Sequence, residues 1–245
     1  MISQIIFETS FAGLIIYLVW VCFLLALGQN SQSDKVELGF DQSYRLVILV
    51  PAMNEEAVIK QTMQLFLKEA HQLENVKMVI IDDASDDQTA AVVKRFISQT
   101  GQERIQLLQR QHPNAQTGKG NALNWAYHQL ALQDGDPKHL ICGVLDADAY
   151  MTEKSYRKVL QYFADDEDLD LLQTRVGMLE TNNWLQLMQD IEFNVINDWI
   201  QNTRNRLGNA AASGNGQFIR VGSVASSRPW GNALLEDFEF STRFF

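Results

Sequence analysis

The chain has 245 residues, of which 46% are hydrophobic, enough to bury a sizeable core, and this excludes intrinsic disorder as a description of the whole. Thirty acidic residues against 20 basic ones give a formal net charge of −10. That charge argues against nucleic acid as a partner, because phosphates attract basic surfaces. The two cysteines, Cys22 and Cys142, provide no disulfide framework.

The chain begins with a long apolar segment. No residue from Phe11 to Leu27 is charged. A helix over residues 5–27 would be about 35 Å long, and a bilayer core is roughly 30 Å thick. A cleaved signal peptide is the alternative, and Ala26-Leu27-Gly28 offers a small-x-small cleavage pattern. However, no basic residue precedes the run, and Glu8 stands where a signal peptide carries positive charge. We therefore predict a retained transmembrane helix at residues 1–28.

A polar stretch at residues 29–43 is predicted to be a linker. Lys35 and Arg45 follow the apolar segment, whereas nothing basic precedes it. By the positive-inside rule this asymmetry places the C-terminal side in the cytoplasm. We therefore expect a protein of the cell membrane whose catalytic domain, residues 44–245, is cytoplasmic.

After the linker, short apolar runs alternate with segments of helical periodicity. Strands are expected at residues 46–50, 78–81, 105–108, 140–145 and 169–175, and helices at 58–70, 89–97, 122–132, 155–163 and 184–205. This alternation predicts an α/β fold with a mainly parallel sheet between helices. Ligands of such sheets bind beyond the carboxyl ends of the strands. The acidic clusters at 82–87 and 146–148 begin where their strands end, which predicts a site there.

The second of these clusters, Asp146-Ala147-Asp148, is a candidate metal site. Carboxylates at positions i and i+2 of a strand extension point to the same side, and together they can hold Mg²⁺ or Mn²⁺. A solvated turn that happens to contain two aspartates is the alternative. Asp-x-Asp alone is a weak signal, and the apolar run before it favours the metal interpretation.

The first cluster, residues 82–87, has the acidic spacing of a calcium loop. It lacks the glycine at the sixth position and the closing glutamate, which excludes an EF-hand. Its two halves are given different roles. Asp83, at the strand tip, is expected to be free to accept hydrogen bonds from a ligand. Asp86 or Asp87, with Ser85, is expected to cap the helix that follows.

Two further motifs each have a functional and a structural interpretation. Gly118-Lys119-Gly120-Asn121 opens a helix, and Lys119 could neutralise a diphosphate there. It is not a P-loop, because Pro113 stands where the first glycine is required and no Ser or Thr follows Lys119. An ordinary glycine-rich loop is the alternative. Glu236-Asp237 could supply a general base, or simply acids at a helix N-terminus.

Taken in order, these motifs resemble glycosyltransferase family 2, which has the GT-A fold. The resemblance covers roughly residues 44–245 and is closest to the membrane-embedded, often processive members that include cellulose, chitin and hyaluronan synthases. It rests on the order of six segments: Pro51-Ala52-Met53-Asn54-Glu55, Asp82-Asp83-Ala84-Ser85-Asp86, Lys119-Gly120-Asn121-Ala122-Leu123-Asn124, Asp146-Ala147-Asp148, Gly214-Asn215-Gly216-Gln217-Phe218 and Glu236-Asp237.

The resemblance implies a metal-dependent inverting transfer from a nucleotide sugar, with a UDP-sugar as the first expectation, to a saccharide or lipid-linked acceptor. Its site residues would be Glu55, Asp83, Lys119 and Asp146 for the nucleotide sugar, Asp146 and Asp148 for Mg²⁺ or Mn²⁺, Asp237 as the general base, and Gly214, Asn215, Gly216, Gln217 and Glu236 for the acceptor. The chain departs from this branch in lacking a Gln-x-x-Arg-Trp motif before Phe245. We therefore expect a C-terminally truncated catalytic domain without further membrane helices.

Two other functions compete with this one. A haloacid-dehalogenase-like phosphatase also uses Asp-x-Asp at a strand end, but it places that pair on the first strand, ahead of its lysine. Here Asp146 follows both Lys119 and Asp82-Asp83, so the order is wrong. A non-catalytic, truncated nucleotide-sugar-binding module is the third possibility.

Overall fold

The structure is a computed structural model that describes residues 2–28, 43–131, 136–178, 183–208, 211–224, 228–231 and 239–240. The chain divides into two compact units. The smaller unit comprises Met1–Asp34 and Arg175–Ala211, and the larger comprises Lys35–Thr174 and Ala212–Phe245.

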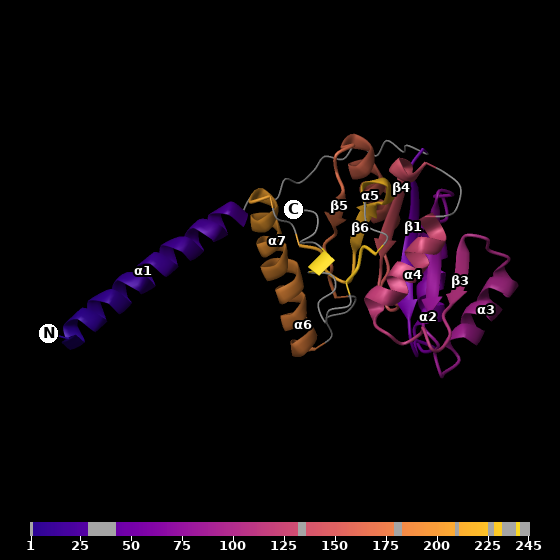
Figure 1. Cartoon of the computed structure of the whole chain (residues 1–245), viewed down its shortest axis with the longest axis horizontal. Helices are drawn as coiled ribbons and strands as arrows, with labels where there is room; N and C mark the ends of the chain where they lie inside the picture. The colour runs from indigo at the N-terminus through magenta and orange to yellow at the C-terminus, as the bar shows by residue number, and fades with distance from the viewer. Residues whose placement is uncertain are drawn as a thin grey trace. The chain divides into compact units, whose positions relative to one another are not determined.

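The larger unit is built on a six-stranded sheet with the order β3-β2-β1-β4-β6-β5 (Figure 1). Its strands are β1 (Arg45–Ala52), β2 (Val76–Asp82), β3 (Ile105–Gln109), β4 (Leu140–Val144), β5 (Leu171–Gln173) and β6 (Gln217–Arg220). The first four are mutually parallel, and β6 runs antiparallel to both of its neighbours. The prediction of a mainly parallel α/β sheet is confirmed.

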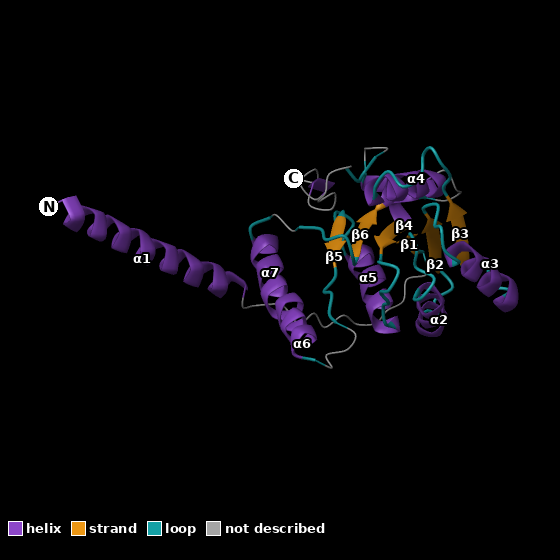
Figure 2. Cartoon of the chain, turned by 90° about the horizontal axis from the view of Figure 1, so that it is seen from below, coloured by secondary structure: helices purple, strands orange, loops and turns teal. Residues whose placement is uncertain are grey.

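Helices cover both faces of this sheet (Figure 2). On one face lie α2 (Ile59–Glu69), α3 (Thr89–Thr100) and α5 (Glu153–Asp165), and on the other lies α4 (Lys119–Ala131). Successive side chains of a strand point to opposite faces. Accordingly Ile48 belongs to the core under α2, α3 and α5, whereas Leu49 belongs to the core under α4. Burial on both sides explains why these strands read as uninterrupted apolar runs.

The strand β6 was not predicted from the sequence. It contains only four residues, and the polar Gln217 and Arg220 at its ends hide the apolar pair between them. In the sheet, Phe218 pairs with Gly143 of β4. A Cβ on Gly143 would stand 2.4 Å from the Phe218 ring, so the close approach of this ring requires glycine.

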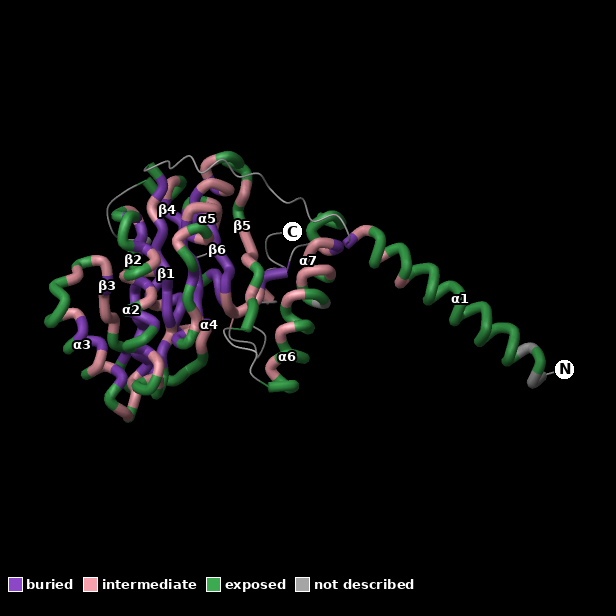
Figure 3. The backbone as a smooth tube through the Cα atoms, turned by 180° about the vertical axis from the view of Figure 1, so that it is seen from behind, coloured by how far each residue is buried: buried purple, intermediate pink, exposed green. Residues whose placement is uncertain are grey.

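The smaller unit contains α1 (Ile2–Gly28), α6 (Trp184–Ile191), a π-helical segment η2 (Glu192–Asn197) and α7 (Asp198–Arg206). The long helix expected at 184–205 is therefore present, with a π segment in its middle. The 23-residue stretch Ile6–Gly28 of α1 is long and apolar enough to cross a membrane. Figure 3 shows α1 exposed along almost its whole length. A signal sequence meets the same criterion.

Candidate active site

The loop after β1 and the loop after β2 are joined by reciprocal hydrogen bonds. Asn54 donates its backbone N–H to Ser85 Oγ at 3.1 Å, and its side-chain oxygen accepts from the N–H of Asp86 at 2.9 Å. The next residue, Glu55, donates its N–H to Thr89 Oγ1 at 2.8 Å. These bonds hold Glu55 at the carboxyl end of β1, on the edge where β2 also ends.

The turn after β2 supports the expected helix cap in part. Asp87 Oδ1 accepts from the backbone N–H of Thr89, the first residue of α3, at 2.8 Å. Asp86 and Ser85 are instead engaged with Asn54 across the loops. Asp87 therefore satisfies the first N–H of α3 from the position before the N-cap, which is Gln88.

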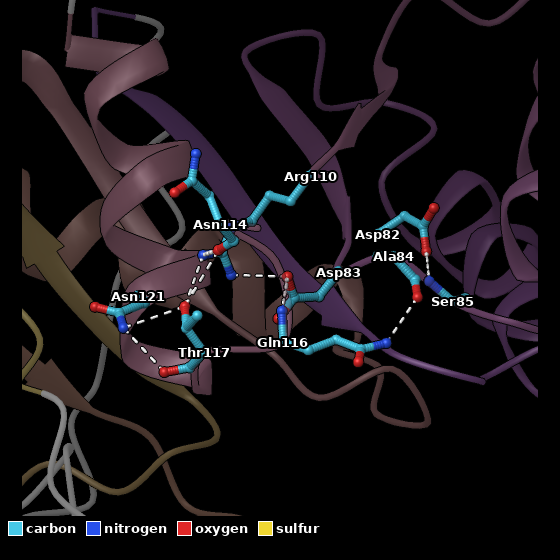
Figure 4. Close-up of polar contacts among 9 residues, drawn as sticks. All are labelled: Asp82, Asp83, Ala84, Ser85, Arg110, Asn114, Gln116, Thr117 and Asn121. Atoms are coloured by element: carbon cyan, nitrogen blue, oxygen red, sulfur yellow. Dashed lines mark hydrogen bonds and ion pairs between the residues drawn. The ribbon is translucent and has the colours of Figure 1, made fainter. Parts of the chain in front are cut away.

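Asp83 is buried, contrary to the expectation that it is free (Figure 4). Its Oδ1 accepts from Arg110 Nη1 at 2.7 Å and from the backbone N–H of Gln116 at 3.0 Å. A ligand donor at this strand tip would have to be met by the other oxygen, Oδ2. The physical reason is the parallel pairing of β2 with β3, which brings Arg110, the residue after β3, beside the end of β2.

Arg110 is a site candidate that the sequence analysis missed. Its side chain is only 5% exposed, and its Nε has no hydrogen-bond partner among the described residues. A buried donor left unpaired is costly, and such donors mark places where a ligand can bind. The signal in the sequence was a basic residue directly after a strand that neighbours the acidic strand tip.

Lys119 brings three predicted segments together. It is the first residue of α4, and its Nζ donates to Asp146 Oδ1 at 2.6 Å and to the carbonyl of Gly214 at 2.9 Å. Asn215 Oδ1 in turn accepts from the backbone N–H of Asp146 at 3.3 Å. The end of β4, the start of α4 and the loop before β6 therefore meet at one place.

The carboxylates near the end of β4 and the start of α4 repel one another. Burial raises the pKa of the Glu55 carboxyl above its ordinary value, and the negative charges of Asp148, Asp87 and Asp146 raise it further. Glu55, at the end of β1, thus shares its electrostatic environment with the Asp-x-Asp pair after β4. A cation or a cationic side chain at this edge relieves the repulsion, as Lys119 does at Asp146.

The donor set suits a hard divalent cation held jointly with a ligand. Asp146 is half-buried and Asp148 is exposed, so both carboxylates are accessible. No group of three or more His, Cys, Asp and Glu side chains within the described part of the chain could form a metal site by itself. Mg²⁺ is commonly bound by one or two carboxylates plus substrate phosphates, so two aspartates are a fitting set.

The segment that leads into β6 is held by hydrogen bonds to the rest of the larger unit, and part of it is buried. Gln217 is 1% exposed, and its amide oxygen accepts from the indole N–H of Trp230 at 3.4 Å. Its side chain therefore has no surface to offer an acceptor, which corrects the expectation for this residue. Gly216 donates its N–H to Val144 O at 2.8 Å, which continues the pairing with β4.

Gln173, at the end of β5, holds this segment in place. Its amide oxygen accepts from the N–H of Ser213 at 2.7 Å, and its amide nitrogen donates to Asn215 O at 2.9 Å. The two remaining predicted site residues, Glu236 and Asp237, lie outside the described residues.

These features define the class of protein. The sheet is open and mainly parallel, and carboxylates stand at the carboxyl ends of β1, β2 and β4 with a lysine at a helix N-terminus. In open α/β sheets, ligands bind at this edge.

The family follows from the comparison with known sequences. The model of the family described as glycosyltransferase like family 2 matches residues 44–242. The chain therefore belongs to glycosyltransferase family 2.

One curated relative and two solved structures are similar to this chain in sequence or in fold. The chain is 30% identical over 195 residues to a beta-monoglucosyldiacylglycerol synthase of Synechocystis sp., and the match covers 79% of this chain but only 38% of that protein. It is similar to the mannosyltransferase PcManGT from Pyrobaculum calidifontis in complex with GDP-Man and Mn²⁺, with a TM-score of 0.65 and 16% identity over 92% of this chain and 58% of that one. For S. aureus TarS in complex with UDP-GlcNAc the TM-score is 0.55, with 16% identity over 81% of this chain and 52% of that one. The structural likenesses establish the GT-A fold.

Proposed function

We propose that the chain carries the donor site of a membrane-anchored, metal-dependent inverting glycosyltransferase. The observation that carries this proposal is the meeting of Lys119, Asp146 and Gly214 at the carboxyl end of β4, with Glu55 in the same electrostatic environment. In a member of glycosyltransferase family 2, this edge is where a nucleotide sugar would bind.

The nucleoside end of the donor is assigned to the tips of β2 and β3. Asp83 supplies an acceptor and the buried Nε of Arg110 a donor, a pairing that suits the N–H and carbonyl of a uracil ring. Glu55 lies at the neighbouring tip and would contact the nucleotide. The donors bound by the structural neighbours are GDP-Man and UDP-GlcNAc. A UDP-sugar is therefore one of two supported donor classes.

The diphosphate is assigned to Lys119 and the Asp-x-Asp pair. Asp146 and Asp148 would hold Mg²⁺ or Mn²⁺, whose charge stabilises a diphosphate leaving group. Lys119 at the N-terminus of α4 adds a positive charge and the helix dipole at the same place. On donor binding, Lys119 can exchange its contact with Asp146 for one with a phosphate oxygen.

The acceptor side rests on the family resemblance. We assign Asp237 as the general base that takes the proton of an acceptor hydroxyl, with Glu236 beside it and Gly214, Asn215 and Gly216 shaping the acceptor site. Direct attack of that hydroxyl on the anomeric carbon inverts its configuration. A lipid acceptor is favoured by the name of the curated relative, a diacylglycerol glycolipid synthase, and by the apolar helix α1. A saccharide acceptor is the second candidate.

The proposed function also includes a location for each unit. We assign α1 as a transmembrane anchor and the larger unit to the cytoplasm, where nucleotide sugars are made.

A nucleotide-sugar panel tests the function directly. The purified chain is mixed with UDP- and GDP-sugars, with and without Mn²⁺, and both binding and hydrolysis are measured. Metal-dependent binding of one donor, with slow hydrolysis, is expected of a glycosyltransferase site. Binding without any hydrolysis would favour the non-catalytic module. Release of inorganic phosphate from simple phosphate esters, with no nucleotide-sugar binding, would favour a phosphatase and contradict the proposal.

A further inference from the structure

The continuous helix formed by α6, η2 and α7 exposes apolar side chains to solvent. Most of the large apolar side chains described for this helix are exposed, with Trp184 at 72%. We use the term apolar stripe for Trp184, Leu187, Met188, Ile191, Val195, Ile200 and Leu207, all exposed. The spacing of three or four residues places the first of these on one side of the helix. Because the wider turn of η2 shifts the helical phase, we expect Ile200 and the C-cap residue Leu207 to return to that side.

Polar side chains outside the stripe contact the chain segments just before and just after this helix. Asp190 accepts from the N–H of Met178 at 3.0 Å, and Asn194 Oδ1 accepts from Arg175 Nε at 2.9 Å. Farther along, Gln201 and the backbone of Ala211 exchange two hydrogen bonds, at 2.7 and 3.2 Å. A surface helix of a water-soluble protein does the reverse, with its apolar side against the protein.

The apolar stripe is continuous with the end of α1. Trp199 and Thr203 follow Val195 at four-residue steps. Trp199 lies so close to Gly28 that a Cβ there would stand 2.0 Å from its ring, and Thr203 Oγ1 donates to Leu24 O at 3.1 Å. Arg206 donates to the carbonyl of Leu27. The same side of the helix therefore meets the segment at which α1 would leave a bilayer.

From this arrangement we infer that the α6–η2–α7 helix lies in the membrane–water interface, with the apolar stripe in the acyl chains and the polar side toward the protein. The inference rests on the proposed membrane anchoring by α1. Helices with an apolar face and a polar face bind in this way, with the apolar face buried about 5–10 Å into the boundary between headgroups and acyl chains. The bilayer is the occupant that the contact with α1 favours, because a membrane-spanning α1 holds the end of α7 at the bilayer surface.

Depth-dependent fluorescence quenching tests this placement. The full chain, with Cys22→Ala and with the buried Cys142 retained, receives one reporter cysteine at a time and is labelled with an environment-sensitive dye. Leu187→Cys and Ile191→Cys report on the apolar stripe, Gln189→Cys and Asn197→Cys on the polar side, and Leu14→Cys on the middle of α1. Each variant is reconstituted in phosphatidylcholine vesicles carrying a nitroxide quencher either near the headgroup or near the end of the acyl chain.

The stripe labels are expected to lose fluorescence mainly with the shallow quencher, the Leu14 label mainly with the deep one, and the polar-side labels with neither. Quenching at Leu14 without quenching of the stripe labels would overturn the inference while leaving the anchor intact. That result would mean that protein, such as the larger unit or a second copy, covers the stripe. Deep quenching of the stripe labels would also overturn it, since the helix would then span the bilayer. Quenching at no position would refute the anchoring itself, and the interfacial placement with it.

Discussion

At the scale of single residues, the site is a set of like charges that the fold holds together. Glu55 illustrates the cost, because its pKa is raised above the ordinary value of 4.5 by burial and by the neighbouring carboxylates. The folded chain therefore retains this proton at pH values where the unfolded chain has lost it. By linkage, this group lowers stability as the pH rises through the window just above 4.5.

We accordingly predict that Glu55→Gln raises the melting temperature at pH 7, because the fold opposes ionisation of this carboxyl by raising its pKa. The gain in unfolding free energy should be no more than about 1 kcal/mol, because solvent screens these charges. The loop contact should survive, since Glu55 donates to Thr89 through its backbone. Melting curves of the parent and the variant at pH 7 and at about pH 4 provide the check. An advantage that persists unchanged at the lower pH would contradict the electrostatic origin.

Asp237 gives the second prediction at this scale. In a longer protein that transfers sugar, Asp237→Asn should lower kcat by about 10²–10⁴, because Asn keeps the shape but cannot accept the acceptor's proton. Donor Kd should barely change. Measuring both quantities in one variant separates this role from helix capping, for which Asn serves nearly as well as Asp. Near-normal turnover would eliminate Asp237 as the base.

At the scale of elements, β6 is held by an unusual arginine. Arg220 is buried, and its guanidinium donates to the carbonyls of Leu169, Lys138, Phe163 and Asp166 at 2.8–3.2 Å. It also lies 5.3 Å from the centre of the Phe163 ring. One side chain thus ties β6 to the end of α5 and to the segment before β4.

Arg220→Lys should therefore destabilise the fold by about 3 kcal/mol, because an ammonium group cannot reach all of these carbonyls and leaves some unpaired. The exposed Arg95 on α3 provides the matched control, and Arg95→Lys should stay within about 0.5 kcal/mol. Urea unfolding of the two variants measures the difference. Equal stabilities would mean that Arg220 is not the tie proposed here.

The strands also show which parts of the fold could be predicted from the sequence. The apolar runs of β1, β2 and β4 were readable because both of their faces are buried. The strand β6 was not, because half of its four residues are polar and find their partners only in the folded sheet: Gln217 with Trp230, and Arg220 with backbone carbonyls. The contact of Asp83 with Arg110 depends likewise on the order of strands in the sheet. Local patterns located the strand ends, but they did not show which side chains would meet there.

At the scale of the whole molecule, the two units are assigned to different surroundings. The smaller one contains the apolar helix α1 and the apolar stripe, and the larger one contains the polar edge of the sheet. We predict that the chain, expressed in cells, pellets with membranes and resists carbonate extraction. Recovery of a mature protein beginning at Gln29 would instead identify residues 1–28 as a cleaved signal peptide. That outcome would also separate the site from cytoplasmic donors.

The proposed function depends on a metal-dependent nucleotide site at the carboxyl ends of the strands. Its most direct test is calorimetric titration of the nucleoside diphosphate selected by the donor panel, with and without Mn²⁺, into the parent chain and Asp148→Ala. Asp148 is exposed, so its loss opens no cavity and the melting temperature should be retained. We predict Mn²⁺-dependent binding by the parent and an affinity at least about tenfold weaker in the variant. Unchanged, Mn²⁺-dependent affinity in a folded Asp148→Ala variant would contradict it.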